Sequence, residues 1–132
     1  MTPTEQKQRA RRFLENFNDA DPQVFADLIT EDFTFEIVSG LKEFPPIRGR
    51  DNFARGESDA LKRLFPNGLK LRLQTIICEG PHVVALGEAD TVAAGDRRYH
   101  QRYAFYLRFA GDLIAEGREY NDTNLVREVF LT

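Results

Sequence analysis

The sequence predicts an α+β fold in which helices cover one face of a curved antiparallel sheet. Two observations lead to this prediction. In the first half, apolar residues recur at helical spacing, and from Leu69 onward they recur at every second position. Helices followed by an antiparallel meander are typical of an α+β fold. We expect one domain over residues 1–132, because this length suits a single core.

Three N-terminal helices are each predicted by a start signal and an apolar face. Thr2-Pro3 and Asp21-Pro22 can open helices, since a polar cap is followed by a proline that gives up only an unpaired N–H. Asp51 is expected to cap the third helix. The inward positions of the three are Ala10, Phe13, Leu14 and Phe17; Val24, Phe25, Leu28 and Ile29; and Phe53, Ala60, Leu61 and Leu64.

The remaining segments alternate or carry turn residues. The stretch "DFTFEIVS" predicts a strand with Phe33, Phe35 and Ile37 on its buried face. Glycines and prolines in 39–50 predict a loop at the mouth of a pocket. Later strands are expected at 69–78, 82–92, 97–109 and 113–121, with helical spacing at 125–130.

The composition excludes several classes of function. A net charge of −3 and a pI near 5.4 argue against nucleic-acid binding, which selects a basic face. No apolar run approaches the roughly 18 residues of a membrane span, and the polar N-terminal residues do not resemble a signal peptide. The single Cys78 fits a reducing cytoplasm. Two isolated histidines give no recognisable ligand spacing, so we expect neither a metal nor a cofactor.

The orientation of Glu119 depends on the register of the last two strands. The odd residues from Tyr99 to Phe109 form the apolar face of the 97–109 strand. A three-residue turn at 110–112 would pair Phe109 with Leu113. Counting from there, Tyr103 faces Glu119, and Gln101 faces Asn121. Glu119 then points inward, into space left by Ala115 and Gly117.

A second register remains open. A two-residue turn at Gly111-Asp112 shifts the pairing by one residue and turns every side chain of the last strand over. Glu119 would then face solvent. We favour the first register, because the second turns Glu116 and Arg118 inward at a cost in desolvation.

The 82–92 strand has a bulkier face, which we interpret as the interior. This face is Val84, Leu86, Glu88, Asp90 and Val92. A four-residue loop at 93–96 would pair Asp90 with Tyr99 and Glu88 with Gln101. Glu88 and Asp90 could equally face solvent, since strand ends often carry exposed acids.

The chain resembles the nuclear transport factor 2-like superfamily, in its SnoaL-like and ketosteroid isomerase-like branch. The likeness covers nearly the whole chain and implies a cone-shaped α+β barrel with a deep pocket between sheet and helices. One turn, "GDLI" in place of "DGKI", departs from the family pattern. The segments that carry the resemblance are "RRFLENFNDADPQVFADLI", "EDFTFEIVSG", "IRGRDNF" and "YLRFAGDLIAEGREYNDT".

The resemblance also implies that the residues of one known reaction, steroid isomerisation, are missing from this sequence. Where ketosteroid isomerases carry a base, a tyrosine and an aspartic acid, this sequence has Ile37, Phe13 and Phe105. All three are apolar, so steroid isomerisation by that mechanism is not expected.

Two other branches leave a partial match. The two acids of limonene epoxide hydrolase-like members fall on Asp90 and Glu119, but Glu88 replaces their arginine, and Phe35 and Ile37 replace their tyrosine and asparagine. In SnoaL-like polyketide cyclases, polar contacts and an acid on the last two long strands are similar in position to Gln101 and Glu119.

These observations suggest a pocket protein for a small apolar molecule. We expect proton-transfer chemistry on a carbonyl-bearing ligand (isomerisation, cyclisation or dehydration), with Glu119 and Asp90 as catalytic residues. A non-catalytic ligand-binding domain is the alternative, and a protein-interaction module is a third class. We also expect a homodimer through the outer sheet face. The expected ligand-binding residues are Gln101, Tyr103, Tyr99, Glu88, Asn121, Phe105, Phe35, Ile37 and Phe13.

Overall fold

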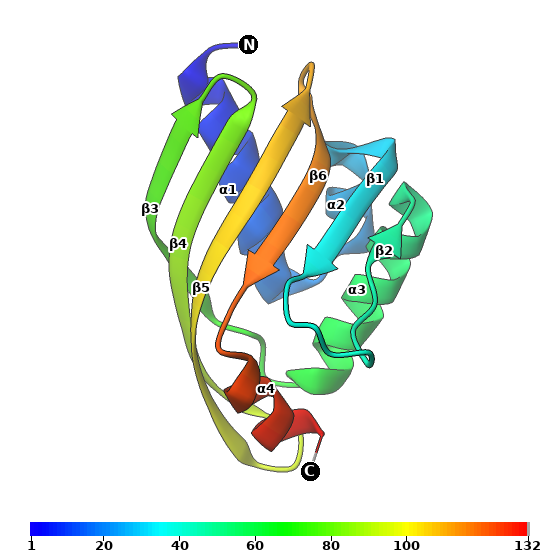
Figure 1. The fold of residues 1–132 in the computed structure, drawn as a ribbon, viewed down its shortest axis with the longest axis vertical. Coiled ribbons are helices and arrows are strands. Elements are labelled where there is room, and N and C mark those ends of the chain that lie inside the picture. The colour runs from blue at the N-terminus through cyan, green and yellow to red at the C-terminus, as the bar shows by residue number, and fades with distance from the viewer. Residues whose placement is uncertain (132) are drawn as a thin grey trace.

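The computed structural model describes residues 1–131, and over that part the chain forms helices packed against one curved sheet (Figure 1). This confirms the α+β prediction. The helices are α1 (Pro3–Asp19), α2 (Pro22–Leu28), α3 (Arg50–Leu64) and α4 (Thr123–Phe130). The strands are β1 (Ile29–Ile37), β2 (Ile47–Arg48), β3 (Leu71–Glu79), β4 (His82–Ala93), β5 (Arg97–Ala110) and β6 (Leu113–Tyr120).

The sheet is mixed and open. Its strand order is β2-β1-β6-β5-β4-β3, with β1 parallel to β6 and the other neighbours antiparallel. The antiparallel prediction is therefore right for β3 to β6 and wrong for β1. The sheet curves around the helices, but β2 and β3 remain edge strands, so the expected barrel is a partly wrapped cone.

Two of the three predicted helix caps are present. The hydroxyl of Thr2 accepts a hydrogen bond from the Glu5 amide at 3.1 Å, and the Asp21 carboxylate accepts one from the Gln23 amide at 2.9 Å. The third prediction is wrong. Gly49, with a φ of 95°, precedes α3, and Asp51 lies in the first helical turn, where its charge still favours the helix dipole.

An aromatic core fills the space between α1, α2, α3 and β1. The Phe13 ring contacts four other phenylalanine rings at centroid distances of 5.4–5.8 Å, including an edge-to-face contact with Phe25. Phe33 and Phe53 approach to 4.9 Å. The helices α1 and α2 lie behind the sheet, whereas α4 lies at the lower end in Figure 1. The core therefore stabilises one end and leaves the other for a cavity.

The β4 strand has the opposite orientation to the one expected. Ala93 pairs with Arg97, so the connecting loop is one residue shorter than the predicted four-residue loop, and the alternation inverts. The inner face carries small residues, among them Ala85, Gly87 and Ala89. Small residues are needed there because a Cβ on Gly87 would lie 3.0 Å from Leu71 Cδ1. Side-chain bulk therefore indicated the wrong face.

The register between β5 and β6 differs from both expected registers. Ala110 pairs with Leu113 across the two-residue turn Gly111-Asp112, which was the disfavoured alternative. A β-bulge at Ala115 then inserts one residue, since Phe109 pairs with Ile114 and Arg108 pairs with Glu116.

The bulge restores the inward direction of the rest of β6. Ile114 and Ala115 are consecutive and both buried, and from Glu116 onward the alternation is that of the favoured register. Glu119 therefore faces the interior, but opposite Phe105 rather than Tyr103. The expected pairing of Gln101 with Asn121 is also wrong.

Candidate active site

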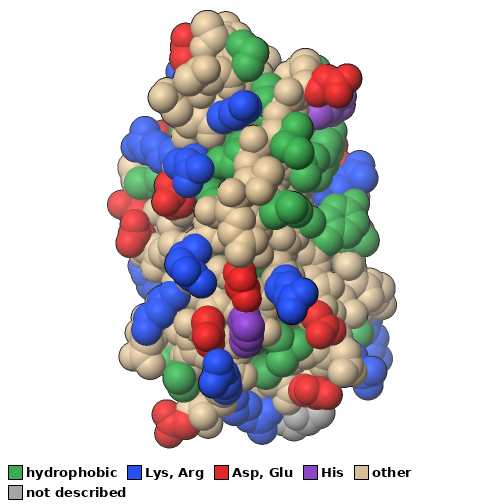
Figure 2. Space-filling view, turned by 90° about the vertical axis from the view of Figure 1, so that its left-hand side faces the viewer, with side chains coloured by type: hydrophobic (Ala, Val, Ile, Leu, Met, Phe, Trp, Pro, Cys, Tyr) green, Lys and Arg blue, Asp and Glu red, His purple; other side chains and the backbone are tan. Residues whose placement is uncertain are grey.

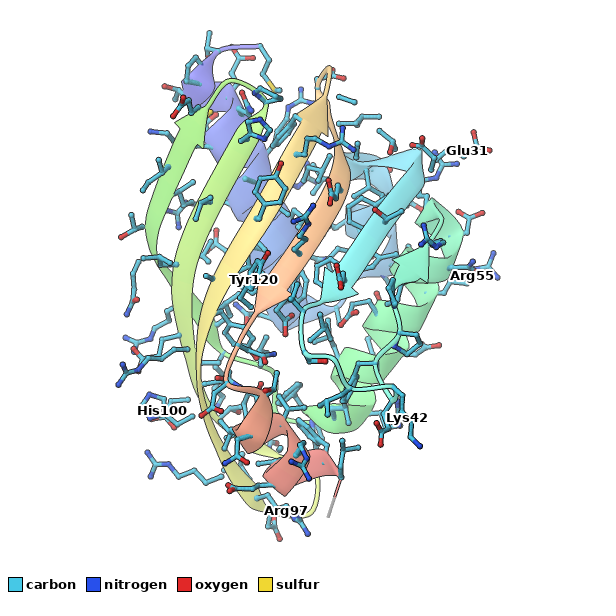
Figure 3. The ribbon with its side chains drawn as sticks, in the orientation of Figure 1. Glu31, Lys42, Arg55, Arg97, His100 and Tyr120 are labelled. Carbon is cyan, nitrogen blue, oxygen red and sulfur yellow. The ribbon has the colours of Figure 1, made fainter. Side chains whose placement is uncertain are left out.

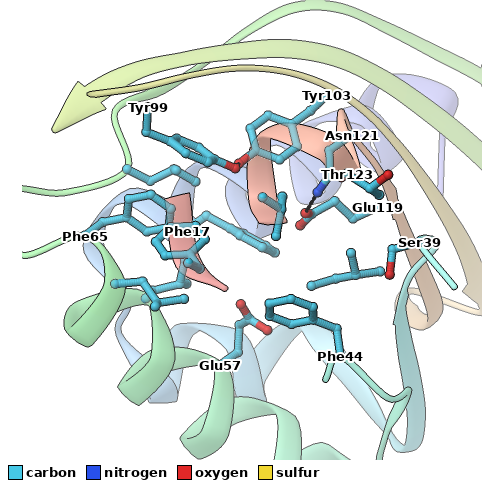
Figure 4. Close-up of a pocket in the computed structure, with 16 residues that line it drawn as sticks. Phe17, Ser39, Phe44, Glu57, Phe65, Tyr99, Tyr103, Glu119, Asn121 and Thr123 are labelled. Atoms are coloured by element: carbon cyan, nitrogen blue, oxygen red, sulfur yellow. Dashed lines mark hydrogen bonds between the residues drawn. The ribbon is translucent and has the colours of Figure 1, made fainter. Parts of the chain in front are cut away.

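A cavity of about 60 Å³ opens between α3, α4 and the adjacent ends of β1, β5 and β6 (Figure 4). Its wall is mostly apolar, and six of the residues that form it are aromatic. Among the described residues that line it, none is lysine, arginine or histidine. They are Phe17, Ile37, Ser39, Phe44, Glu57, Leu61, Leu64, Phe65, Leu69, Tyr99, Tyr103, Glu119, Asn121, Thr123, Val126 and Phe130.

Glu119 projects into this cavity from the end of β6 and is 8% exposed. The side-chain amide of Asn121 donates a hydrogen bond of 2.8 Å to its Oε2. The pKa of Glu119 is raised to about 8, chiefly by burial and also by the negative charge of Glu57, while the Asn121 hydrogen bond acts in the opposite direction. The carboxyl group is therefore protonated over most of the neutral range.

Glu57 brings a second carboxyl group to the cavity, from α3. Figure 4 shows it on the side opposite Glu119, with its oxygens directed into the space between them. Burial raises the pKa of Glu57 to about 7. The two groups interact, so they titrate as a coupled pair across neutral pH.

Glu57 is absent from the residues predicted from sequence, although a signal for it was present. Glu57 is four residues after Phe53 and four before Leu61, both of which are buried. It therefore lies on the apolar face of α3, as residues four apart share one helix face. A carboxylate on such a face is rare unless it is paired or functional.

Two tyrosines from β5 complete the polar part of the wall. The hydroxyl groups of Tyr99 and Tyr103 lie 2.7 Å apart and share one hydrogen bond. Burial raises the pKa of Tyr103 well above its usual value, and the neighbouring Tyr99 and the charges of Glu119 and Glu57 act in the same direction. Both hydroxyl groups therefore stay neutral, and one hydroxyl proton remains available to a ligand.

Asn121 has one unsatisfied atom. Its Oδ1 is buried without a hydrogen-bond partner among the described residues, while its Nδ2 holds Glu119. Such groups are rare in folded proteins and often mark functional sites.

The predicted acids of β4 lie outside the cavity. Glu88 contacts His100 and Gln74, and Asp90 forms a 3.3 Å ion pair with Arg98, all on the outer sheet face. His100 points away from the fold in Figure 3. The prediction that Glu88 and Asp90 face the interior is therefore wrong, because the β4–β5 loop is one residue shorter than expected.

Other predicted ligand-binding residues are structural. Gln101 is 1% exposed and clamps Asp122 by accepting from its amide at 2.9 Å and donating to its carbonyl at 3.0 Å. Phe13, Phe35 and Phe105 are buried in the core and do not line the cavity. Of the residues predicted from sequence, the cavity brings together Glu119, Tyr99, Tyr103, Asn121 and Ile37.

Neither a metal centre nor a membrane span is found in the described part of the chain. No group of three histidine, cysteine, aspartate or glutamate side chains in residues 1–131 is arranged to hold a metal ion. In the same range, no helix combines the length and apolarity that a bilayer span requires.

Solved structures share this fold at low sequence identity. A proposed isomerase from Bacillus subtilis superposes with a TM-score of 0.82 at 20% identity, covering 98% of this chain and 96% of that one. A proposed SnoaL-like polyketide cyclase from Jannaschia sp. CCS1 gives 0.81 at 16%, covering 98% and 94%. An LEH-like epoxide hydrolase from M. tuberculosis gives 0.78 at 20%, covering 97% and 90%.

Sequence comparison is more specific. No curated protein matches the chain. Residues 10–117, however, match the SnoaL-like domain family over most of the sequence. The chain therefore belongs to the SnoaL-like domain family.

Proposed function

We propose that this protein is an isomerase or lyase that moves a proton on a small, largely apolar ligand bearing a carbonyl group. The observation that supports this proposal is the placement of Glu57 and Glu119 on opposite sides of one aromatic cavity. Two carboxyl groups with pKa values of about 7 and about 8 provide a base and an acid at the same pH.

The proposed step begins with Glu57 ionised and Glu119 protonated. The Glu57 carboxylate takes a proton from the carbon next to the carbonyl. The electron pair of that C–H bond forms a carbon–carbon double bond, and the π electron pair of the carbonyl moves onto its oxygen. Glu119 donates its proton to that oxygen, which completes the tautomerisation to the enol, or to a leaving group on the next carbon. Reversal of the enol step returns a solvent-exchanged proton to the carbon, so exchange requires both carboxyl groups. The proton count is balanced, because one carboxyl group gains what the other loses.

The developing charge on the carbonyl oxygen needs a hydrogen-bond donor. The Tyr99–Tyr103 pair offers one, since the two hydroxyl groups share a single hydrogen bond and keep a second proton free. The apolar wall excludes water, which strengthens this interaction.

Hydrogen exchange at carbon tests this proposal with simple carbonyl compounds in place of the natural substrate. Small ketones and enones, such as cyclopentenone, are incubated with the protein in D₂O, and deuterium uptake beside the carbonyl is followed by NMR. We expect protein-dependent exchange that falls by about 10²–10⁴ in Glu119→Gln. Glu57→Gln should lose exchange similarly.

Glu36→Gln is the matched control. Glu36 is an exposed glutamate on β1, next to the cavity-lining Ile37, so this variant removes the same charge outside the cavity. Exchange that persists unchanged in Glu119→Gln would refute the assignment. Binding of these ketones without any exchange would favour a ligand-binding domain instead.

A further inference from the structure

The carboxyl groups in the cavity differ from those elsewhere on the sheet. On the outer face, Glu116 lies 3.2 Å from Arg108 and 2.8 Å from Arg118, and Asp90 pairs with Arg98. Glu57 and Glu119 face a wall without a basic side chain among the described lining residues. Buried acids without a cation must hold protons or accept a positive charge from a bound molecule.

The rest of the wall suits an organic cation. Aromatic faces attract cations through the negative charge above the ring, most strongly where water is excluded. Phe44 and Tyr103 come from two different segments and lie on either side of the space between the two carboxyl groups, and Phe65 forms a more distant part of the same wall (Figure 4). Glu119 is more than nine-tenths buried, and only its Oε2 has a hydrogen-bond partner among the described residues.

The size of the cavity limits the ligand. A water molecule needs roughly 10–15 Å³ of such space. The cavity of about 60 Å³ therefore holds about five groups the size of water or methyl. A quaternary ammonium ion with four methyl groups has this size, and a hydrated metal ion would not use the aromatic wall.

We propose that this cavity binds small organic cations, protonated or quaternary amines of about five non-hydrogen atoms, between Glu57 and Glu119. The inference uses the same cavity as the proposed function but does not depend on turnover. Binding a cation stabilises both carboxylates, so it releases protons from the pair. The titratable groups that face Glu119 are Glu57 from α3 and Tyr99 and Tyr103 from β5, and both tyrosines stay neutral up to pH 9.

Tetramethylammonium and tert-butanol form a matched pair of probes, because they are similar in size and differ in charge. Their dissociation constants are measured by titration calorimetry at pH 6 and pH 9, at one ionic strength. At pH 9, tetramethylammonium should bind at least tenfold more tightly than tert-butanol. At pH 6 it should lose at least tenfold in affinity, because both carboxyl groups are then protonated, whereas tert-butanol binding should not change.

Substitutions of the two glutamates test whether these carboxyl groups cause the preference for the cation. Glu57→Gln and Glu119→Gln should each weaken tetramethylammonium binding at pH 9 by about tenfold, while Glu36→Gln should not. The pH dependence of the unaltered protein gives a readout even if one variant fails to fold.

Tetramethylammonium that binds no more tightly than tert-butanol at pH 9 would overturn the inference. The two proposals fail separately. Ketone exchange that requires Glu119 would stand without ammonium binding, and ammonium binding would stand without exchange.

Discussion

Glu119 keeps its proton at neutral pH because burial costs its charged form more than one hydrogen bond from Asn121 returns. The same group should make the stability of the fold depend on pH. Its pKa is about 8 in the folded chain and near the ordinary value of 4.5 in the unfolded chain. Between these values the folded state binds more protons, so stability must fall as the pH rises.

We therefore expect urea denaturation to give a lower free energy of unfolding at pH 8.5 than at pH 5, by on the order of a few kcal/mol. Glu119→Gln should remove most of this difference, because its neutral amide does not titrate. The half-buried Glu57 should account for a smaller remainder. A pH dependence equally steep in the variant would contradict the raised pKa of Glu119.

At the residue scale, the sequence predicted part of the site. Alternation on the 97–109 strand identified Tyr99 and Tyr103, and the oddity of a carboxylate in a terminal strand identified Glu119. Glu57 is not among the predicted site residues, because the inward face of a helix is predicted from its apolar positions and Glu57 is an acid among them. Gln101 was predicted to bind the ligand, because the sequence does not distinguish a buried amide that binds a ligand from one that binds the Asp122 backbone.

At the scale of elements, the sequence predicted helices and strands better than their pairing. The orientation of β4 depended on a loop of three or four residues, and its bulkier face proved to be the outer one. For β6, a two-residue turn and a bulge at Ala115 together gave the inward direction expected from a longer turn. The turn is one residue shorter than predicted, and the bulge adds one residue that was not predicted. Because side chains alternate with a period of two, these two differences cancel in the direction of Glu119.

Gly117 lies on β6 where this strand closely approaches β1, and a substitution there tests how tight the packing is. A Cβ at this position would lie 2.8 Å from Phe35 Cδ1, inside the core. We expect Gly117→Ala to lower the free energy of unfolding by about 1–3 kcal/mol. Thermal or urea denaturation measures the change.

Gly56→Ala is the control for that substitution. Gly56 is exposed in the middle of α3, and a Cβ there meets nothing within 4 Å. This variant should gain about 0.5–1 kcal/mol, because alanine favours the helix. Equal effects of the two substitutions would mean that Phe35 does not pack against Gly117.

The clamp of Gln101 on Asp122 should hold α4 against the sheet. Arg97 adds two contacts at the other end of this helix, to the carbonyl groups of Glu128 and Val129, and Figure 3 places Arg97 beside α4. We expect Gln101→Leu to raise amide hydrogen exchange in α4 about tenfold, since an unpaired buried backbone group costs about 1–3 kcal/mol. Unchanged protection of α4 would show that the clamp is not needed.

At the scale of the whole molecule, the outer sheet face carries an apolar patch that the predicted β4 orientation had hidden. Ile77 pairs with Val84, and Leu86 and Tyr120 both flank Ala104, so these side chains form one surface across four strands. All four are 39–58% exposed. Figure 2 shows hydrophobic side chains gathered on one side of the molecule, above acidic and basic side chains around a histidine.

We propose that this patch is a homodimer interface, because exposed apolar surfaces of this kind mark interaction sites. Light scattering should give twice the chain mass, and Leu86→Lys should give the monomer. Val92→Lys is the control, as Val92 is equally exposed on the same face of β4 but pairs with Arg98, away from the patch. A monomer for the unaltered protein would contradict the expectation.

The fold thus places its aromatic core and its candidate site at opposite ends of the molecule. Phenylalanines between α1, α2, α3 and β1 fill one end, and the apolar cavity under α4 holds two carboxyl groups at the other. The proposed acid–base pair depends on both groups titrating near neutral pH in one enclosed space.

A ¹³C NMR titration of the glutamate side chains tests most directly whether Glu57 and Glu119 both titrate near neutral pH. In the unaltered protein, two carboxyl signals should titrate between about pH 7 and 8, and Glu57→Gln should lower the pKa of the Glu119 signal. The account would be contradicted if Glu119 titrated near 4.5, or if its titration were unchanged in Glu57→Gln.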